Sequence, residues 1–313
     1  MELLIFNDFA DYLKSKLEPR FPEITIRAAT REEKIKDLIE KINILITFHV
    51  SDEMIKKAPR LQWIQAMTTG VDFITKMPSL KSDVLITSAR GIHGPQMSEM
   101  AILLMLSLSR NFPEFVRNQD QQVWERWPAK LLYQKKVGIL GLGVCGTEIA
   151  RKCKAFGMTV YGINRTKREI DSVDHFFDPN GLLQVIGEVD YFVIVVPSTP
   201  ETRNMVNAEA IAAMKPSAFL INLGRGAVVD EAALTKALQT EKIAGAALDV
   251  FSVDPDPLPK ANPLWGMKNV IITPRVGGAT DIYPDQVLPV IEENLQRFLR
   301  GERRDLINVV EWS

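Results

Sequence analysis

The sequence predicts an α/β protein with two doubly wound parallel sheets in two domains. Short aliphatic and β-branched runs alternate with charged, amphipathic segments, which is the pattern of parallel strands connected by helices. This alternation occurs twice, once before residue 100 and again from Lys136 onward. The chain has 313 residues, more than a single core usually fills, so two domains are expected.

The first series contains five expected strands separated by charged segments such as REEKIKDLIEKI. In chain order the strand runs are ELLIF, ITIRA, INILITF, LQWIQ and DVLITS. A long helix is expected from near Pro95, in PQMSEMAILLMLSLSRN. A polar stretch with Trp124 and Trp127 follows it to Gln134 and separates the two series.

The second series contains six expected strands with helical patterns between them. They are KVGIL, MTVYGIN, DYFVIVV, AFLINL, IAGAALDV and NVIIT. The last helix, DQVLPVIEENLQRFLRG, has no strand after it, so we expect it to pack on the first domain. The predicted domains are therefore residues 1–100 with 283–313, and residues 101–282.

Composition and charge exclude several classes of protein. Apolar residues make up 46% and charged residues 25%, and the formal net charge is −1, so no nucleic-acid partner is expected. No apolar run approaches the ~20 residues that cross a bilayer, and the N-terminus lacks the basic region of a signal peptide. Cys145 and Cys153 fall in one expected helix, too far apart to bridge. These features predict a cytoplasmic protein with reduced thiols, no membrane association and no metal site.

A glycine-rich turn predicts a dinucleotide-binding Rossmann domain. The run GLGVCG from Gly141 follows a strand and opens a helix, and a second strand comes within ~30 residues. We expect Gly141 to permit the tight turn, Gly143 to let the backbone approach a pyrophosphate, and Gly146 to allow close packing of helix on sheet. Val144, at the start of the helix, is counted with these glycines as cofactor-binding. A glycine-rich turn without a ligand is the alternative.

The end of the next strand favours NADP(H) over NAD(H). Sites for NAD place an acidic residue about 20 positions after the turn, where it binds the ribose diol. Here the stretch is Asn164, Arg165 and Thr166, without a carboxylate, and a guanidinium suits a 2′-phosphate. We therefore expect these three residues to bind NADP(H), with NAD(H) as the second choice. The alternative is that Arg165, Lys167 and Arg168 form a solvated face.

Five motifs occur in a defined order along nearly the whole chain. They are TTGVD from Thr68, GLGVCG from Gly141, VVPSTPETRNMVN from Val195, MKPSAFLINLGRGAVVDEAAL from Met214 and AALDVF from Ala246. In this order they resemble the D-isomer-specific 2-hydroxyacid dehydrogenase family, which includes the glyoxylate/hydroxypyruvate reductases. The resemblance implies a Rossmann cofactor domain, a flavodoxin-like substrate domain, and a homodimer whose dimer-facing segment begins near Trp124 and Trp127.

The resemblance also implies a substrate site. Arg225 would bind the 2-oxoacid, because its planar guanidinium can form two hydrogen bonds to a carboxylate. The backbone N–H groups of Gly70 and Val71 would bind the same carboxylate. Gly224 and Gly226 flank the arginine and indicate a backbone crowded against a ligand. A structural salt bridge is the alternative for Arg225.

The cofactor and acid-base residues of the family map onto the C-terminal part of the same domain. Asp249 would lie near the nicotinamide carboxamide, with capping of a turn as its alternative role. Pro197 and Leu223 would also contact the cofactor. The family pairs a glutamate with a histidine, and the glutamate's place falls in SVDPDPLP. Direct alignment selects Asp254 for that place, and a shift of two residues selects Asp256.

The family's histidine lies in a T-P-H stretch, which here reads ITPRVGGA, so Arg275 takes its place. Arginine stays protonated at physiological pH and cannot act in turn as acid and base. Three outcomes are open. Arg275 could stabilise a developing alkoxide while another group supplies the proton, it could bind a second anionic group of a different substrate, or it could pair with Asp254 in a protein that no longer catalyses.

Among the three histidines, His93 is the one expected near the site, because it stands just before the long helix. It is a candidate proton donor, and a histidine in a turn is the alternative. Together these features predict an oxidoreductase that reduces a small 2-oxoacid of the glyoxylate or hydroxypyruvate type to a D-2-hydroxyacid with NADPH. The alternative is a catalytically silent NADP(H)-binding protein with a sensing or scaffold role.

Overall fold

The computed structural model describes residues 1–35, 38–252 and 257–312 and divides into two compact units. The first unit is residues 1–92 with the C-terminal stretch from Thr280, and the second is residues 93–279. Both boundaries fall earlier in the chain than residues 100 and 282, where the sequence placed them. The first shift arises because helix α4 (Gly94–Arg110) packs along α6 (Val144–Ala155) over its length and so belongs wholly to the second unit.

The first unit holds a parallel sheet of five strands in the order β2-β1-β3-β4-β5, which is the flavodoxin-like order predicted. Its strands are β1 (Glu2–Phe6), β2 (Thr25–Ala29), β3 (Ile44–Thr47), β4 (Trp63–Ala66) and β5 (Leu85–Thr87). Its helices are α1 (Ala10–Leu17), α2 (Asp52–Lys56), α3 (Asp72–Thr75), α10 (Tyr283–Leu299) and the 3₁₀ turns η1 (Glu32–Lys34) and η2 (Ile39–Lys41). All residues of β3 and β4 are buried, because helices cover both faces of the sheet.

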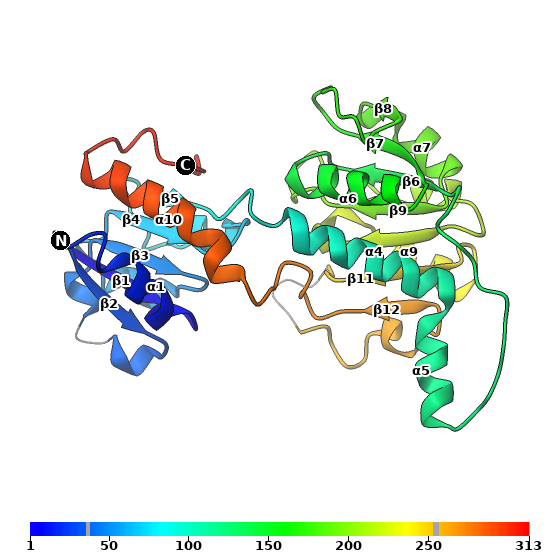
Figure 1. Ribbon diagram of the computed structural model, residues 1–313, viewed down its shortest axis with the longest axis horizontal. Helices are drawn as coiled ribbons and strands as arrows, with labels where there is room; N and C mark the ends of the chain where they lie inside the picture. Colours follow the sequence, from blue (N-terminus) through cyan, green and yellow to red (C-terminus); the bar gives the residue numbers. More distant parts are fainter. Residues whose placement is uncertain (36–37, 253–256, 313) are drawn as a thin grey trace. The chain divides into compact units, whose positions relative to one another are not determined.

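Helix α10 completes the core of the first unit although it comes from the far end of the chain. Its apolar face, which includes Ile291 and Phe298, packs against strand residues such as Ile5. Burial of each such side chain contributes ~1.5–3 kcal/mol to folding. The buried Asn294 on α10 also donates to Gln65 Oε1 at 3.0 Å and accepts from the Ile307 N–H at 2.6 Å. The first unit is therefore discontinuous in sequence (Figure 1).

The second unit holds a parallel sheet of seven strands in the order β12-β11-β10-β9-β6-β7-β8. Its strands are β6 (Lys136–Leu140), β7 (Thr159–Ile163), β8 (His175–Phe177), β9 (Tyr191–Ile194), β10 (Phe219–Asn222), β11 (Gly245–Leu248) and β12 (Val270–Ile272). Six of them are the expected ones. Strand β8 was missed, because this edge strand is only three residues long and lies partly in solvent, so it lacks a buried apolar run.

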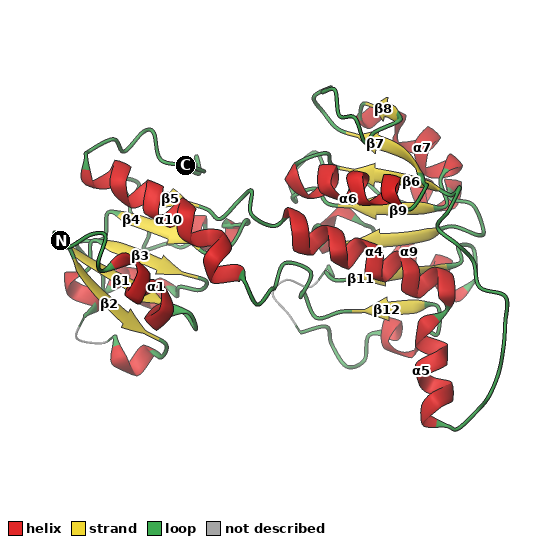
Figure 2. Ribbon diagram, viewed as in Figure 1, coloured by secondary structure: helices red, strands yellow, loops and turns green. Residues whose placement is uncertain are grey.

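Helices cover both faces of the seven-stranded sheet (Figure 2). Helices α4 and α6 pack on one face, and α7 (Leu182–Glu188), α8 (Ala208–Ala213) and α9 (Glu231–Gln239) pack on the other. The remaining elements are α5 (Phe112–Asp120), η3 (Pro179–Gly181), η4 (Gly226–Val228) and η5 (Pro263–Gly266). The chain leaves β6 toward β7 and β8 and returns to β9 on the other side of β6. The predicted doubly wound Rossmann sheet is confirmed, and its switch point lies between β6 and β9.

Two further expectations concern α6 and the membrane. Cys145 and Cys153 are free thiols on α6, and burial raises the pKa of Cys153 to about 12. Within the described ranges, no helix combines the length and the apolar character that a membrane span requires.

Candidate active site

The glycine turn lies directly after β6, at the switch point of the larger sheet. Gly141 has φ +100°, a backbone conformation that residues other than glycine rarely adopt. A Cβ on Gly146 would lie 1.8 Å from the Gly141 carbonyl oxygen, so α6 can approach the turn only through glycine. A Cβ on Gly143, in contrast, would meet no atom within 4 Å. Two of the glycines are needed by the turn itself, and the third leaves an open face.

That open face has the features of a pyrophosphate site. No side chain caps the N-terminus of α6, whose first residue, Val144, is 55% exposed. A depression of about 490 Å³ lies here, and its lining includes Gly143, Val144 and Arg168. The uncapped N–H groups and the helix dipole favour an anion. The residues present therefore fit the phosphates of a dinucleotide.

Asn164, at the end of β7, connects the basic segment to the glycine turn. Its Oδ1 accepts the Leu142 N–H at 3.2 Å, and its Nδ2 donates to the Thr166 carbonyl at 2.8 Å. The Arg168 guanidinium donates to the Leu142 carbonyl at 2.5 Å. Arg168 thus reaches the candidate cofactor site, although the sequence interpretation treated it only as part of a solvated face. The basic run itself was the signal, but its return to the turn is a tertiary contact that spacing does not show.

Arg165 and Thr166 are exposed beyond the end of β7. The Thr199 hydroxyl, and to a smaller extent the charge of Arg165, lower the pKa of Glu201. Arg165 therefore lies close to the loop that follows β9. This loop contains Pro197, whose carbonyl accepts from the Thr202 hydroxyl at 2.7 Å. The predicted cofactor residues after β6, β7 and β9 consequently lie at the same edge of the sheet.

Arg225 stands on the loop after β10, next to the buried Leu223. The buried side chain of Asn222 fixes this loop, because it donates to the Arg225 carbonyl at 3.1 Å and accepts from the Gly224 N–H at 3.1 Å. The guanidinium is half-buried and donates to the Gly224 carbonyl at 2.8 Å. A planar guanidinium of this kind is suited to bind a carboxylate through two parallel hydrogen bonds.

The glycines beside Arg225 are required by neighbouring loops of the protein. A Cβ on Gly224 would lie 2.7 Å from the Val196 carbonyl oxygen, and one on Gly226 would lie 1.7 Å from the Phe251 carbonyl oxygen. The expected crowding against a ligand stays a prediction. These glycines fix the path of the loop that carries Arg225.

Asp249 follows β11 and is only 3% exposed. Its Oδ1 accepts from the Thr273 hydroxyl at 2.6 Å and from the Val276 N–H at 3.0 Å, and its Oδ2 accepts from the Gly277 N–H at 3.0 Å. Burial raises the pKa of Asp249, while these donors and the charge of Arg275 oppose the rise. The carboxylate therefore caps the turn at residues 273–277, and its contact with nicotinamide stays a prediction.

Arg275 lies on the turn that Asp249 holds. It is exposed, and its φ of +53° is in the left-handed region that favours glycine. Its charge reaches Asp249. Asp254 and Asp256, the two residues considered for the family's glutamate, lie outside the described residues.

His93 lies immediately before α4, against the turn that carries Arg275, and the charge of Arg225 reaches it. Its Cδ2 is 3.3 Å from the position of a Cβ on Gly278. Burial, and secondly the charge of Arg225, lower the pKa of His93. Of the other histidines, His175 is on the edge strand β8, where its ring lies tilted against Tyr161 of β7, and His49 is in the first unit. The structure thus brings together His93, Arg225 and the turn of Arg275.

Gly70 and Val71 are in the first unit, on the loop after β4. The Thr68 hydroxyl donates to the Gly70 carbonyl at 2.8 Å, and Val71 immediately precedes the short helix α3. The N–H groups of such a loop can bind an anion, and their assignment to the substrate stays a prediction. Among the residues that the structure describes, no cluster of three or more metal-ligating side chains occurs.

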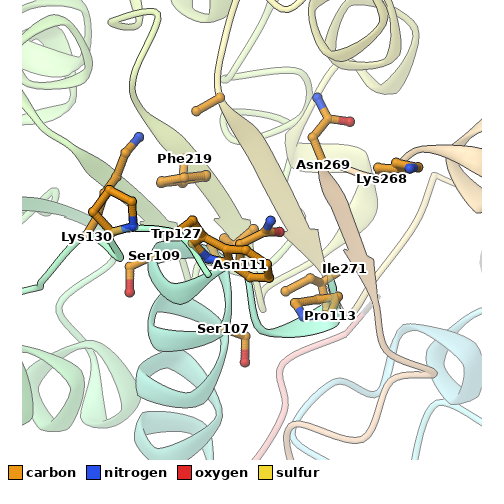
Figure 3. A pocket seen from close by; sticks show the side chains of 13 residues that line it. Ser107, Ser109, Asn111, Pro113, Trp127, Lys130, Phe219, Lys268, Asn269 and Ile271 are labelled. Atoms are coloured by element: carbon orange, nitrogen blue, oxygen red, sulfur yellow. The ribbon is translucent and has the colours of Figure 1, made fainter. Parts of the chain in front are cut away.

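A separate cavity of about 390 Å³ lies near the amino-terminal ends of strands of the larger sheet (Figure 3). Phe219, Asn269 and Ile271, at the beginnings of β10 and β12, line it together with Asn111 and Trp127 from the segment after α4. Because the strands are parallel, the glycine turn is at their other ends. This cavity is therefore not part of the candidate active site.

Comparisons with known proteins agree with this geometry. Residues 102–277 match the model of the D-isomer specific 2-hydroxyacid dehydrogenase, NAD binding domain. A glyoxylate reductase of Pyrococcus furiosus is 32% identical over 91% of this chain and 88% of its own. A D-3-phosphoglycerate dehydrogenase of Methanocaldococcus jannaschii is 32% identical over 90% of this chain but only 54% of its own, so the chain spans about half of that relative.

Solved structures extend the similarity to the whole fold. A D-isomer specific 2-hydroxyacid dehydrogenase family protein from Aeromonas salmonicida has a TM-score of 0.92 and 33% identity, over 100% of this chain and 99% of its own. An NADPH-dependent glyoxylate/hydroxypyruvate reductase from Sinorhizobium meliloti, solved with NADP and sulfate, has a TM-score of 0.84 and 27% identity, over 99% of this chain and 98% of its own. The match to an NAD binding domain confirms the predicted class of cofactor, a nicotinamide dinucleotide.

The different surroundings of Gly143 and Gly146 give a matched pair of variants. Gly143→Ala should keep the melting temperature but weaken NADPH binding about tenfold, because the methyl group enters the space for the phosphates at a cost of ~1–3 kcal/mol. Gly146→Ala should lower the melting temperature, because its methyl group overlaps the Gly141 carbonyl. Thermal unfolding and NADPH fluorescence titration measure the two effects. Unchanged NADPH affinity in Gly143→Ala would place the cofactor elsewhere.

Proposed function

The chain belongs to the D-isomer-specific 2-hydroxyacid dehydrogenase family, and we propose that it reduces a small 2-oxoacid to a D-2-hydroxyacid with NADPH. Glyoxylate and hydroxypyruvate are the proposed substrates. The observation that carries the proposal is the position of Arg225, a half-buried guanidinium on a loop that Asn222 fixes, in the same unit as the glycine turn and His93. The names of the Pyrococcus and Sinorhizobium relatives support the choice of substrate class.

Different residues of this chain have different roles in the proposed reaction. When bound, NADPH supplies a hydride to the carbonyl carbon of the 2-oxoacid. Arg225 binds the substrate carboxylate through two parallel N–H donors and so fixes the position of the neighbouring carbonyl. Arg275 adds a permanent positive charge that stabilises negative charge on the carbonyl oxygen. Because a guanidinium does not release its proton near neutral pH, the proton must come from another group.

The preference for NADPH rests on the basic segment after β7. Arg168 donates to the glycine turn, and Arg165 stands exposed one residue after Asn164. The residue at the end of β7 is Asn164, which has an amide and not the carboxylate that binds a ribose diol. Its amide is hydrogen-bonded within the protein. The Sinorhizobium relative, which was solved with NADP, supports the same preference.

We further propose that the protein acts as a homodimer through the segment from α4 to residue 133. Large apolar side chains are exposed along this segment: Leu103, Phe112, Phe115, Val116, Val123, Trp124, Leu131 and Tyr133. Trp124 is 87% exposed. Trp127, three residues later, lines the cavity shown in Figure 3. Exposed large apolar side chains that gather on one segment are typical of a protein interface.

Removal of the guanidinium tests the substrate assignment. Arg225→Ala should lower kcat/KM for glyoxylate by a factor on the order of 10²–10³, because the carboxylate loses a charged, hydrogen-bonded partner. The affinity for NADPH should not change. Steady-state kinetics on a panel of 2-oxoacids measures the loss, with the exposed Arg304→Ala as a control. If the unaltered chain binds NADPH but reduces no 2-oxoacid, the silent dinucleotide-binding protein is the better description.

Cofactor preference can be tested at Arg165. Arg165→Ala should raise KM for NADPH about tenfold and leave KM for NADH unchanged, since only the 2′-phosphate needs the guanidinium. The exposed neighbour Lys167 provides the matched control, and Lys167→Ala should change neither value. An unchanged ratio of the two KM values in Arg165→Ala would refute the role of this residue.

The proposed interface can be tested at Trp124. Trp124→Asp should convert a dimer into a monomer at micromolar concentration, because an exposed tryptophan at an interface typically contributes ~2 kcal/mol or more. Sedimentation equilibrium gives the mass directly. Trp265 is also exposed but lies on η5, so Trp265→Asp should remain dimeric. A monomeric unaltered chain would contradict the proposal.

A further inference from the structure

We propose that His93 supplies the proton that the carbonyl oxygen receives during reduction, in place of the family's histidine, whose position Arg275 occupies. The inference rests on the proposed reductase function. It assigns to the start of α4 a role that the motif comparison assigns to the turn after β12.

The groups already placed in the site cannot supply this proton. Arg225 and Arg275 remain protonated throughout the physiological range. Asp249 accepts three hydrogen bonds through its two oxygens, and all of them come from its own turn. In the second unit, the histidines are His93 and His175. His175 is on the edge strand β8, two strands from the glycine turn after β6, whereas His93 packs against Gly278 in the turn of Arg275 and the charge of Arg225 reaches it.

The start of α4 is fixed against the turn of Arg275. The carbonyl of His93 accepts the Met97 N–H at 3.1 Å, in the first turn of the helix. Gln96 donates to the Gly278 carbonyl at 3.5 Å, and the His93 ring lies against Gly278 itself. A Cβ on Gly277 would lie 3.4 Å from atoms of Met97. Since Asp249 holds the same turn through Gly277, the imidazole has a defined position relative to it.

The charge beside His93 couples its protonation to the substrate. Burial and Arg225 both favour the neutral imidazole while no anion is bound. A carboxylate on Arg225 offsets the positive charge of the guanidinium, so it raises the pKa of His93. The 2-oxoacid therefore brings about the protonated imidazole that its own reduction requires. Other charged groups near the start of α4 include Asp249 and Arg275 from the turn, Glu148 of α6 against Gly94, Lys152 of α6, which donates to the Pro95 carbonyl, and Glu99 on α4.

The proton and electron balance is complete with this assignment. The hydride of NADPH adds to the carbonyl carbon, and the π electrons of the C=O bond move to the oxygen. An imidazolium N–H of His93 transfers its proton to that oxygen, which gives the 2-hydroxyacid, NADP⁺ and a neutral imidazole. The imidazole takes up a proton from solvent before the next turnover. In the oxidative direction the neutral imidazole accepts the hydroxyl proton.

Kinetics of a histidine variant test the role directly. His93→Gln should lower kcat for glyoxylate reduction by ~10²–10⁴, the usual contribution of a general acid. The exposed His175 gives the matched control, and His175→Gln should keep the unaltered kcat. In the unaltered enzyme, kcat/KM and kcat should both fall as pH rises, and the midpoint for kcat should lie at the higher pH. This separation is expected because the bound carboxylate raises the pKa of His93 in the complex.

A titration observed by nuclear magnetic resonance does not depend on turnover. The protein labelled with ¹³C-histidine is saturated with NADP⁺ and titrated with and without oxamate, a 2-oxoacid analogue. The chain has three histidines, so His49→Gln and His175→Gln assign the His93 resonance by elimination. The pKa of His93 should lie below the ordinary value of histidine without oxamate and should rise when oxamate binds. A pKa of His93 that oxamate does not change would overturn the inference, even if His93→Gln folds poorly.

The outcomes separate the two proposals. Turnover by the unaltered chain that survives His93→Gln, with the same pH profile, overturns the role of His93 and leaves the reductase intact. Absence of turnover on every 2-oxoacid overturns the reductase and the role of His93 together. A large loss of kcat in His93→Gln, with the two pH midpoints separated in the unaltered enzyme, supports both.

Discussion

The buried carboxylate of Asp249 is the constraint on which the candidate active site depends. A buried anion is costly unless donors surround it, and this one receives three hydrogen bonds from Thr273, Val276 and Gly277. If the turn moved away, the carboxylate would remain buried without partners. The turn is therefore fixed to the end of β11, and Arg275 is held in a backbone conformation that an isolated peptide would rarely populate. The start of α4 then packs against a rigid surface.

The parallel sheet explains why residues so distant in sequence share one edge. The glycine turn, Asn164, Pro197 and Arg225 each follow a different strand, and parallel strands bring their carboxyl ends to the same side. Glycine appears where loops from neighbouring strands cross at close range, as at Gly146 and Gly226. At these glycines the loops approach each other more closely than a Cβ would permit. The side chains that these loops carry are therefore brought near one another.

The sequence predicted the two sheets, the order of the motifs and the glycine turn, because these depend on local patterns. The φ of Gly141 and the crowding of Gly146 agree with the roles expected of them. Contacts between separate loops could not be predicted from the sequence. Arg168 returns to Leu142 across the strand end, and the glycines around Arg225 avoid the protein's own backbone. The partner of Asp249 is likewise a turn that begins only at Thr273, after strand β12, so no local spacing could identify it.

Helix α10 is synthesised long after the strands on which it packs. Asn294 and Gln65, which share a buried hydrogen bond, are separated by 229 residues. At ~5–20 residues per second, a ribosome needs on the order of 10–50 s to synthesise that interval. During this time the five strands of the first unit lack α10, which shares the cover of one of their faces with α1, whereas the second unit is completed and can fold. The apolar strand residues that α10 covers therefore stay exposed until the last part of the chain is made.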